Sequence, residues 1–418
     1  MQITTLSNGI RVVTETMPRV ETASFGIWVD AGARYEAPEV NGVAHMLEHM
    51  AFKGTATRTA KAIAEEIEDV GGSLNAYTGR EHTAYYARIL AEDVPLAADI
   101  LTDILRHSTF DAEEYEKERH VILQEIGETQ DTPSDLVFDQ FQEAAFPNQP
   151  IGRSILGSEA IIETLPRDAL QTFIDSHYGP EALIVAASGK VEHDAIVALA
   201  TEKFGDLAKS PKPVPAPASY TGSEWLSGRD LEQVHLCLGL EAFAYTDPDF
   251  IPLQVFQTAL GGGMSSRLFQ EVRENRGLCY SIFTFAGLHK DSGVFGIYAG
   301  TGEQDVPELV HVIAKELRDL ASSIGEAELR RAKAQLKASL LMGQEGCFSV
   351  CEDIARQFLC FGDYLTPAEL TARYEAVDAA AIARVAARLL KDPKPTVAAI
   401  GPAKGLPDAG TWLDRLSH

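Results

Sequence analysis

The sequence predicts an α+β fold of two similar domains, each with a largely antiparallel sheet packed with helices. Three observations support this prediction. A proline-rich segment divides the chain near its middle, the two halves share one order of apolar and charged stretches, and strand patterns occur as hairpin-like pairs between helical patterns. The 418 residues are 45% hydrophobic and 23% charged, which is ordinary for a globular protein of two or more domains.

The dividing segment reads AKSPKPVPAPASYTGS and covers residues 208–223. Its repeated prolines exclude a helix or a central strand, because proline lacks the backbone N–H that both structures need. We therefore expect an extended, semi-rigid linker. It separates an N-terminal domain, residues 1–207, from a C-terminal domain, residues 224–418.

Both halves follow the same order of elements: a strand, an apolar helix, a strand pair and a charged helix. In the first half the opening strand lies in residues 23–37, the strand pair in 71–89 and the charged helix in 112–128. In the second half the corresponding ranges are 233–247 for the strand, 250–263 for the apolar helix, 277–300 for the strand pair and 326–342 for the charged helix. The two domains are therefore predicted to be degenerate copies of each other.

The apolar helix of the first half contains the segment NGVAHMLEHMAFKGT, residues 41–55. In a helix, His45 and His49 lie one above the other, and Glu48 borders the same face. Two imidazoles in this arrangement can bind one metal ion, with a carboxylate beside them to move a proton. The order H-x-x-E-H is typical of the inverted zinc peptidases. The alternative is a core helix with two hydrogen-bonded histidines, which the histidine pair with its flanking Glu disfavours. The second half has no such motif.

A catalytic zinc ion usually has three protein ligands, so a third ligand is expected elsewhere. Glu118, Glu125 and Glu128 share one helical stripe with Val121. The buried side of this helix is predicted to carry Val121, Ile122 and Ile126. Carboxylates beside a buried stripe are costly unless they are paired or bind metal. The alternative is the solvated rim of an amphipathic helix, and helical spacing alone does not choose among the three.

The formal net charge of −25 argues against nucleic acid as a partner, because nucleic acid requires a basic surface. It is compatible with cationic partners, and equally with solubility alone. No apolar run is long enough for a transmembrane helix, and we expect no membrane association. The five cysteines form no C-x-x-C motif, which favours reduced thiols. Together with the lack of a targeting pattern, this predicts a cytoplasmic protein.

Four stretches resemble the pitrilysin-type inverzincin peptidases, and within them the β-type mitochondrial processing peptidases and their bacterial single-chain relatives. They are GVAHMLEHMAFKGT, GGSLNAYTGREHTAYYA, ERHVILQEI and GRSILG. In that family the third ligand is a Glu 76 residues after the second His, which corresponds to Glu125 (125 − 49 = 76). The Glu seven residues earlier corresponds to Glu118, a partner of a ligand. The resemblance implies one zinc ion per chain.

The resemblance also implies site residues outside the zinc motif. An Arg and a Tyr seven residues apart reach the zinc in this family, and Arg273 and Tyr280 have that spacing. The stretch SLNAYTG resembles the edge strand that pairs with extended substrate. Asn75, Ala76 and Tyr77 would supply main-chain hydrogen bonds and part of a subsite wall. Without the resemblance these would be an ordinary strand, a surface Arg and a half-buried Tyr.

The implied function is that of a zinc metalloendopeptidase acting on short, unfolded, basic peptides. Glu48 would take a proton from water and deliver it to the leaving amine, and Tyr280 with Arg273 would stabilise the oxyanion. The chain has the length of one half-shell in this family. Two copies would form a clamshell homodimer in which Arg273 and Tyr280 act on the zinc site of the partner.

Two alternatives remain. One is a catalytic subunit that needs a different partner chain, which the presence of Arg273 and Tyr280 disfavours. The other is a non-catalytic structural core subunit, as in the respiratory bc1 complex. Such subunits typically have degraded zinc motifs, whereas all four residues of the motif are present here: His45, Glu48, His49 and Glu125.

Overall fold

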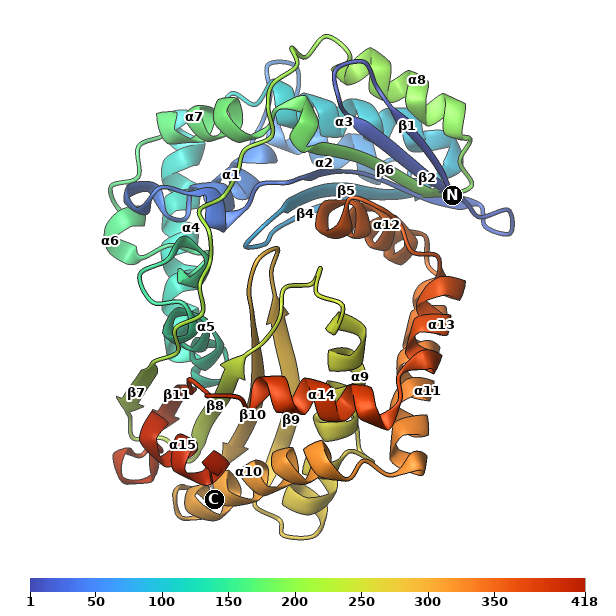
Figure 1. Ribbon diagram of the computed structural model, residues 1–418. Helices are drawn as coiled ribbons and strands as arrows, with labels where there is room; N and C mark the ends of the chain where they lie inside the picture. The colour runs from blue at the N-terminus through green and yellow to red at the C-terminus, as the bar shows by residue number, and fades with distance from the viewer. Residues whose placement is uncertain (418) are drawn as a thin grey trace. The chain divides into compact units, whose positions relative to one another are not determined.

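The computed structural model describes residues 1–417, and the chain forms two compact units (Figure 1). Unit 1 contains residues 1–127, 153–216 and 342–364, and unit 2 contains residues 128–152, 217–341 and 365 onward. The chain passes from one unit to the other at Ala216 and Pro217, inside the predicted linker. The predicted domains were continuous in sequence, whereas each unit here includes a segment from the other half of the chain.

Packing explains both exchanged segments. Helix α5 (Pro133–Ala145) comes from the first half but packs on strands β8 and β11 of unit 2. Helix α12 (Cys347–Phe361) comes from the second half but packs on strands β2, β3 and β6 of unit 1. Sequence patterns show that these helices are amphipathic but not which sheet they cover, so the exchange was not predicted.

Unit 1 is built on a six-stranded sheet in the order β1-β2-β6-β3-β5-β4. All neighbouring strands are antiparallel except the parallel pair β2 and β6. The strands are β1 (Gln2–Thr5), β2 (Arg11–Thr16), β3 (Thr22–Val29), β4 (Ser73–Thr78), β5 (Thr83–Leu90) and β6 (Leu183–Gly189). Strand β4 is therefore an edge strand of this sheet.

Helices cover both faces of this sheet. Figure 1 shows α3 and α8 over one face and α12 under the other. The helices that lie wholly in unit 1 are α1 (Val43–Ala51), α2 (Ala60–Glu68), α3 (Val94–Arg106), α6 (Glu159–Ile162), α7 (Asp168–His177) and α8 (His193–Phe204), together with α12. Helix α4 (Ala112–Asp131) lies in unit 1 up to Gly127, and its last turn belongs to unit 2. Because β3 is covered on both faces, seven of its eight residues are buried, which explains its nearly continuous apolar sequence.

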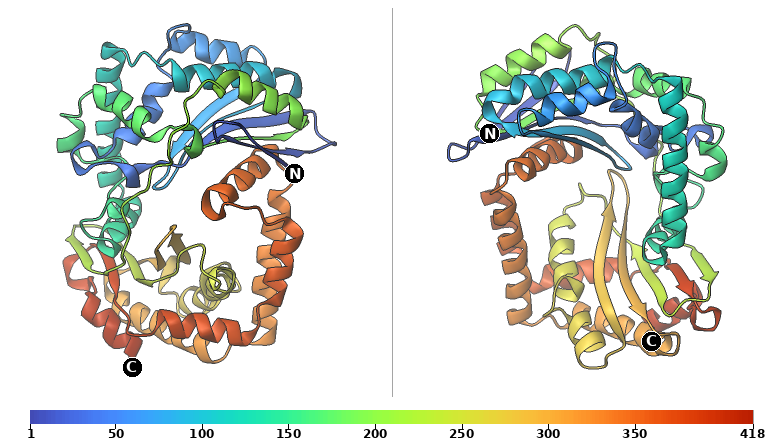
Figure 2. Two further views of the ribbon diagram at one scale, coloured as in Figure 1. Left: turned by 45° about the horizontal axis from the view of Figure 1, so that its top comes forward. Right: turned by 180° about the vertical axis from the view of Figure 1, so that it is seen from behind.

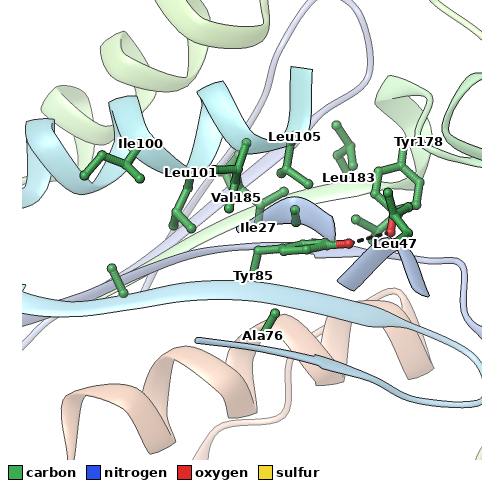
Figure 3. Close-up of a cluster of buried hydrophobic side chains, with 14 of the residues drawn as sticks. Ile27, Leu47, Ala76, Tyr85, Ile100, Leu101, Leu105, Tyr178, Leu183 and Val185 are labelled. Carbon is green, nitrogen blue, oxygen red and sulfur yellow. Dashed lines mark hydrogen bonds between the residues drawn. The ribbon is translucent and has the colours of Figure 1, made fainter. Parts of the chain in front are cut away.

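The core of unit 1 holds helix α1 in place. Leu47 of α1 is 2% exposed and lies in the apolar cluster of Figure 3, beside Tyr85 and Tyr178. The hydroxyl groups of these two tyrosines are 3.0 Å apart and hydrogen-bonded, so neither buried hydroxyl lacks a partner. Ala76 of β4 belongs to the same cluster. The edge strand and α1 therefore share one core.

Unit 2 repeats this plan with a five-stranded sheet in the order β7-β11-β8-β10-β9. Only β7 and β11 are parallel. Figure 2 shows the long β9–β10 hairpin from behind. The strands are β7 (Glu224–Gly228), β8 (Val234–Glu241), β9 (Cys279–Leu288), β10 (Gly293–Thr301) and β11 (Thr396–Gly401). The helices are α9 (Phe250–Gly261), α10 (Val306–Ser322), α11 (Glu326–Gly343), α13 (Pro367–Ala376), α14 (Ala379–Leu389) and α15 (Ala409–Ser417), together with α5.

The predicted fold class is confirmed, since two sheet-plus-helix units with largely antiparallel sheets are present. Each unit has its own apolar core. Among residues 1–417, no helix is both long enough and apolar enough to span a bilayer.

Candidate metal centre

His45, His49 and Glu125 lie together on unit 1. One ligand atom from each lies within 4.8 Å of the other two. The Nε2 atoms of both histidines are 3.6 Å from the same oxygen, Oε2 of Glu125. The two imidazole rings have their centroids 4.6 Å apart and are inclined by 72°. Three donor atoms therefore converge on one point from two different helices, α1 and α4.

The burial pattern of α1 explains why these side chains share a face. Six of its nine residues are buried, and all six are apolar: Val43, Ala44, Met46, Leu47, Met50 and Ala51. The remaining three positions are His45, Glu48 and His49, which are only partly buried. The apolar residues fix the rotation of the helix against the core. The polar face is thereby turned towards α4.

Glu118 of α4 contacts the Nδ1 side of the His49 ring. Its Oε2 atom lies 2.9 Å from Nδ1 of His49, and its Oε1 atom accepts a hydrogen bond from Nζ of Lys53 at 2.6 Å. Burial alone would raise the pKa of Glu118, but the hydrogen bonds from Lys53 and His49 outweigh it, and the net pKa is lowered. A carboxylate here keeps the proton of His49 on Nδ1 and leaves Nε2 free to bind a metal ion.

The predicted buried side of α4 was partly wrong. Val121 is 37% exposed, whereas Glu118 is 6% exposed and lies on the buried side with Ile122 and Ile126. The carboxylate can occupy that side because Lys53 and His49 satisfy both of its oxygens. Glu128, the third carboxylate of the predicted stripe, is exposed.

Glu48 of α1 lies beside the end of strand β4. The hydroxyl of Thr78, the last residue of β4, donates a hydrogen bond to the backbone oxygen of Ala44 on α1 at 3.4 Å. Burial raises the pKa of Glu48, and the polar groups of Thr78 oppose the rise. A carboxyl group with a raised pKa is suited to accept a proton and later release it.

The donor set fits a zinc ion. Two neutral imidazoles and one carboxylate are a common ligand set for catalytic zinc. Burial, with a smaller contribution from His49, lowers the pKa of His45 to about 4, so this imidazole is neutral at pH 7 and its lone pair is available. Only small movements are needed to bring the three donors to bonding distance, since zinc–ligand bonds are about 2.0–2.2 Å long.

The predicted substrate strand is β4, and it lies at the edge of its sheet. Asn75 is exposed, and its Oδ1 atom accepts a hydrogen bond from the backbone N–H of Ala76 at 2.8 Å. The hydroxyl of Tyr77 lies 3.1 Å from Oε1 of Glu352, on helix α12, and accepts a hydrogen bond from Nε1 of Trp28 at 3.3 Å. The Tyr77 side chain is therefore fixed against α12.

Arg273 and Tyr280 belong to unit 2 and contact each other. The guanidinium carbon of Arg273 is 4.4 Å from the ring centroid of Tyr280 and 4.7 Å from that of Phe269, which are cation–π distances. Arg273 lies in a π-helical turn, Phe269–Glu274, a rare geometry that is frequent at functional sites. Tyr280 is 74% exposed.

Comparison with known proteins identifies the family. Residues 11–159 match the family "Insulinase (Peptidase family M16)", and residues 164–336 match "Peptidase M16 inactive domain". The chain is 41% identical to the "Probable mitochondrial-processing peptidase subunit beta, mitochondrial" of Arabidopsis thaliana, over 99% of this chain and 81% of that protein. The chain belongs to peptidase family M16. The resemblance seen in the sequence is thereby confirmed.

Other M16 relatives include bacterial proteins. An "Uncharacterized zinc protease" of Rickettsia felis is 42% identical over 88% of this chain and 90% of its own length. Two solved structures share the fold with a TM-score of 0.88 each. "Complex III2 from Candida albicans, Inz-5 bound" is 24% identical and covers 99% of both chains. "The crystal structure of a protease from Helicobacter pylori" is 22% identical and covers 96% of this chain and 99% of that chain.

Two residues of this M16 site were missed in the sequence. Lys53 lies four residues after His49, so helical periodicity could have placed it near the same face. Thr78 directly follows the Asn75–Tyr77 segment, but its contact with α1 depends on how β4 packs against that helix. Local spacing does not reveal such a contact.

Proposed function

We propose that this chain is a zinc-dependent endopeptidase that hydrolyses short, unfolded, basic peptides. The observation that carries the proposal is the convergence of His45, His49 and Glu125, with Glu48 on the same face of α1. The names of its M16 relatives, which include zinc proteases and processing peptidases, support it. We place the activity in the cytoplasm, because all five cysteines are free thiols, as a reducing compartment leaves them.

In this proposal His45, His49 and Glu125 hold the zinc ion. When bound, zinc supplies a Lewis acid that lowers the pKa of water towards about 7. The Glu48 carboxylate accepts the proton of the attacking water and delivers it to the nitrogen of the leaving amine. The polar groups of Thr78 favour the charged form of this carboxylate. Glu118 keeps His49 in the tautomer that presents Nε2.

Strand β4 is the proposed substrate holder. An extended peptide would add to its free edge beside Asn75 and Ala76, and main-chain hydrogen bonds would give affinity with little sequence preference. The Asn75 side chain, now bonded to the N–H of Ala76, would have to accommodate the incoming peptide. The net charge of −25 favours cationic peptides, because long-range attraction raises their encounter rate.

The proposal includes a homodimer. Arg273 and Tyr280 would stabilise the oxyanion in the site of the partner copy, as in a clamshell formed by two chains. Such donors are typically worth about 10²–10³ in rate. The stacking of Arg273 on Tyr280 supports a joint role for the two side chains, since it keeps the guanidinium beside the phenol.

The test is peptide hydrolysis by the purified chain alone, together with gel filtration. We expect a dimer that cleaves a basic peptide faster than an acidic peptide of the same length, and that loses activity with a zinc chelator. Raising the salt should reduce the difference, because the screening length falls to about 8 Å at 0.15 M. Activity that appears only with a second, different chain would support the partner-dependent alternative. Failure to bind zinc under any condition would support the structural subunit instead.

The shared site has a separate test by mixing two defective variants, Glu48→Gln and Tyr280→Phe. In a mixed dimer with shared sites, one site carries both defects and the other carries neither. Random exchange puts about half of the dimers in the mixed state. The pool should then recover about a quarter of the wild-type activity per chain if the sites are independent. No gain over the separate variants, with exchange verified by tagged subunits, would exclude the shared site.

A further inference from the structure

Glu36 is a buried carboxylate surrounded by hydrogen-bond donors. It is 3% exposed. Its Oε2 atom accepts hydrogen bonds from the backbone N–H of Gly42 at 2.9 Å and from Nδ2 of Asn41 at 2.7 Å. Its Oε1 atom accepts from the backbone N–H of Ala44 at 2.8 Å. The first N–H groups of a helix have no partner within the helix, so Glu36 satisfies two of them at the start of α1.

The N-cap position of α1 explains why the carboxylate comes from six residues earlier. The N-cap is Gly42, in the left-handed conformation with φ of 98°. A Cβ atom there would lie 2.7 Å from Cδ1 of Ile162 and 2.8 Å from the backbone oxygen of Leu156. A Ser, Thr or Asp cap, the usual solution, therefore does not fit. The capping function passes to Glu36, whose negative charge also suits the positive end of the helix dipole.

The GRSILG stretch, residues 152–157, holds Glu36 and Asn41 in place. Nη2 of Arg153 donates a hydrogen bond to the backbone oxygen of Glu36 at 2.7 Å, and Nδ2 of Asn41 donates to the backbone oxygen of Ser154 at 3.1 Å. Gly157 has φ of 79°, and a Cβ atom there would lie 2.5 Å from the backbone oxygen of Asn41. The close approach requires glycine. This gives a physical role to a sequence stretch that the proposed mechanism does not use.

Arg153 is the cation that accompanies the buried carboxylate. The pKa of Glu36 is raised to about 7, because burial raises it more than the hydrogen bonds from Asn41, Ala44 and Gly42 and the charge of Arg153 lower it. Within residues 1–417, Nε and Nη1 of Arg153 are buried without a hydrogen-bond partner. Such burial is costly for a guanidinium group, and the neighbouring carboxylate offsets part of that cost.

The two zinc-binding histidines are held in different ways. His49 is fixed through its ring, since Nδ1 bonds to Glu118. The buried Nδ1 of His45 has no hydrogen-bond partner among the described residues. The placement of His45 therefore depends on the backbone of α1 and on packing. His45 is the third residue of this helix, so its position depends directly on the first turn.

We propose that Glu36 and Arg153 are positioning residues of the metal centre: they fix the first turn of α1 and thereby the placement of His45. This inference rests on the proposed zinc function. Removing a partner that orients a ligand typically costs about 10–100-fold in metal affinity or activity. We expect a loss in that range for Glu36→Gln and Arg153→Met. Arg153→Lys, which keeps the charge, should recover most of it.

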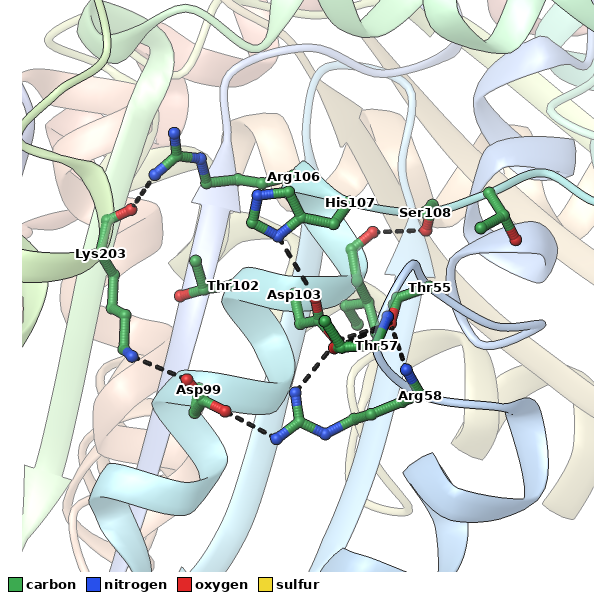
Figure 4. A network of polar contacts seen from close by, with 12 residues as sticks. Thr55, Thr57, Arg58, Asp99, Thr102, Asp103, Arg106, His107, Ser108 and Lys203 are labelled. Carbon is green, nitrogen blue, oxygen red and sulfur yellow. Dashed lines mark hydrogen bonds and ion pairs between the residues drawn. The ribbon is translucent and has the colours of Figure 1, made fainter.

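The experiment measures Co²⁺ as a probe of the site, by its visible absorption and by competition with a chelator. The control variants are Asp103→Asn and Arg58→Met, which change a similar buried pair in unit 1 (Figure 4). Asp103 is 6% exposed and accepts hydrogen bonds from the hydroxyls of Thr55 and Thr57 and from Arg58 at 3.0 Å. Within residues 1–417, none of these residues hydrogen-bonds or ion-pairs with His45, His49 or Glu125, so the controls report the cost of losing a buried charge pair alone.

Glu36→Gln and Arg153→Met should bind Co²⁺ more weakly, with an altered absorption spectrum and a lower kcat at unchanged KM. The controls should keep the wild-type spectrum at a similar loss of thermal stability. Equal Co²⁺ affinity and spectrum in both sets would overturn the inference. If Glu36→Gln does not fold, the Arg153→Met and Arg153→Lys pair decides by the same readouts. Wild-type protein that binds no Co²⁺ or Zn²⁺ would instead overturn the proposed function.

Discussion

Glu118→Gln should weaken zinc binding without abolishing it. The Glu118 carboxylate serves two donors, Nδ1 of His49 at 2.9 Å and Nζ of Lys53 at 2.6 Å. A glutamine at this position has only one acceptor oxygen, so one of the two donors would face the NH₂ group of the glutamine instead. One charge-assisted hydrogen bond is therefore lost and one donor is left facing another donor.

The expected magnitude follows from these two contacts. A hydrogen bond to a charged group contributes about 1.5–3 kcal/mol, because its loss leaves a buried partner unsatisfied. At about 1.4 kcal/mol per factor of ten, this predicts a loss of zinc affinity of about 10–150-fold. Lys53→Met should cost less, since it removes one donor and leaves the His49 contact intact. Glu125→Gln and His49→Ala should lose zinc altogether, because two ligands make a weak site.

The assay is competition for zinc with a chromogenic chelator, with each variant checked for folding by circular dichroism. Asp103→Asn is the matched control for replacing a buried carboxylate by an amide in the same unit. Tight zinc in Glu125→Gln together with zinc loss in Glu118→Gln would reverse the two assignments. Wild-type affinity in Glu118→Gln would show that the His49 ring needs no carboxylate partner.

Three further outcomes are expected. Glu48→Gln should abolish hydrolysis and keep zinc bound, because it preserves shape and removes the base; cleavage at the wild-type rate with full zinc content would exclude this base. Phe269→Leu should lower kcat and Phe269→Tyr should not, since only an aromatic ring stacks on Arg273. Such a cation–π interaction is worth about 0.5–2 kcal/mol. Equal rates in both variants would contradict a role of Phe269 in holding Arg273. Leu47→Ala should destabilise the protein by about 2–5 kcal/mol in denaturant titration, because Leu47 is 2% exposed in the core of Figure 3; a loss below about 1 kcal/mol would mean that the core refills the cavity.

The sequence predicted the elements of the fold better than their grouping. The strand pairs and long helices appear in the predicted order, because strand alternation and helical periodicity are local properties. The placement of α5 and α12 was not predictable in the same way. Their apolar faces match any apolar sheet surface, and only the complete chain determines that α12 covers β3 and β6.

The site shows the same division between local and distant information. His45, Glu48 and His49 share a face because helical geometry requires it, so spacing was sufficient. The choice of Glu125 over its neighbours came from the family resemblance, and the structure places Glu125 beside both histidines. Periodicity misassigned Val121 to the buried side, because the contacts that allow Glu118 to be buried come from a different helix.

Helix α9 of unit 2 contacts its edge strand much as helix α1 of unit 1 does. In unit 1, the hydroxyl of Thr78 in the edge strand β4 donates to the backbone oxygen of Ala44 on α1 at 3.4 Å. In unit 2, Gln257 of α9 bonds to Thr284 of the edge strand β9: its Nε2 atom donates to the backbone oxygen of Thr284 at 3.2 Å, and the Thr284 hydroxyl donates to the backbone oxygen of Gln257 at 2.9 Å. The helix-to-strand contact is present in both units, but an amide cannot act as a base.

The positions around Gln257 extend the comparison. If Gln257 of α9 corresponds to Glu48 of α1, then Gln254 corresponds to His45 and Thr258 corresponds to His49. Their side chains make structural hydrogen bonds, to the hydroxyl of Tyr374 and to a backbone oxygen of α9. Neither is a usual zinc ligand. Within residues 1–417, His45, His49 and Glu125 form the one cluster of His, Cys, Asp or Glu side chains that is close enough to hold a metal ion. We therefore expect one zinc ion per chain by elemental analysis of dialysed protein, falling to none in His49→Ala; a value near two, or one ion retained in His49→Ala, would mean that a second site exists.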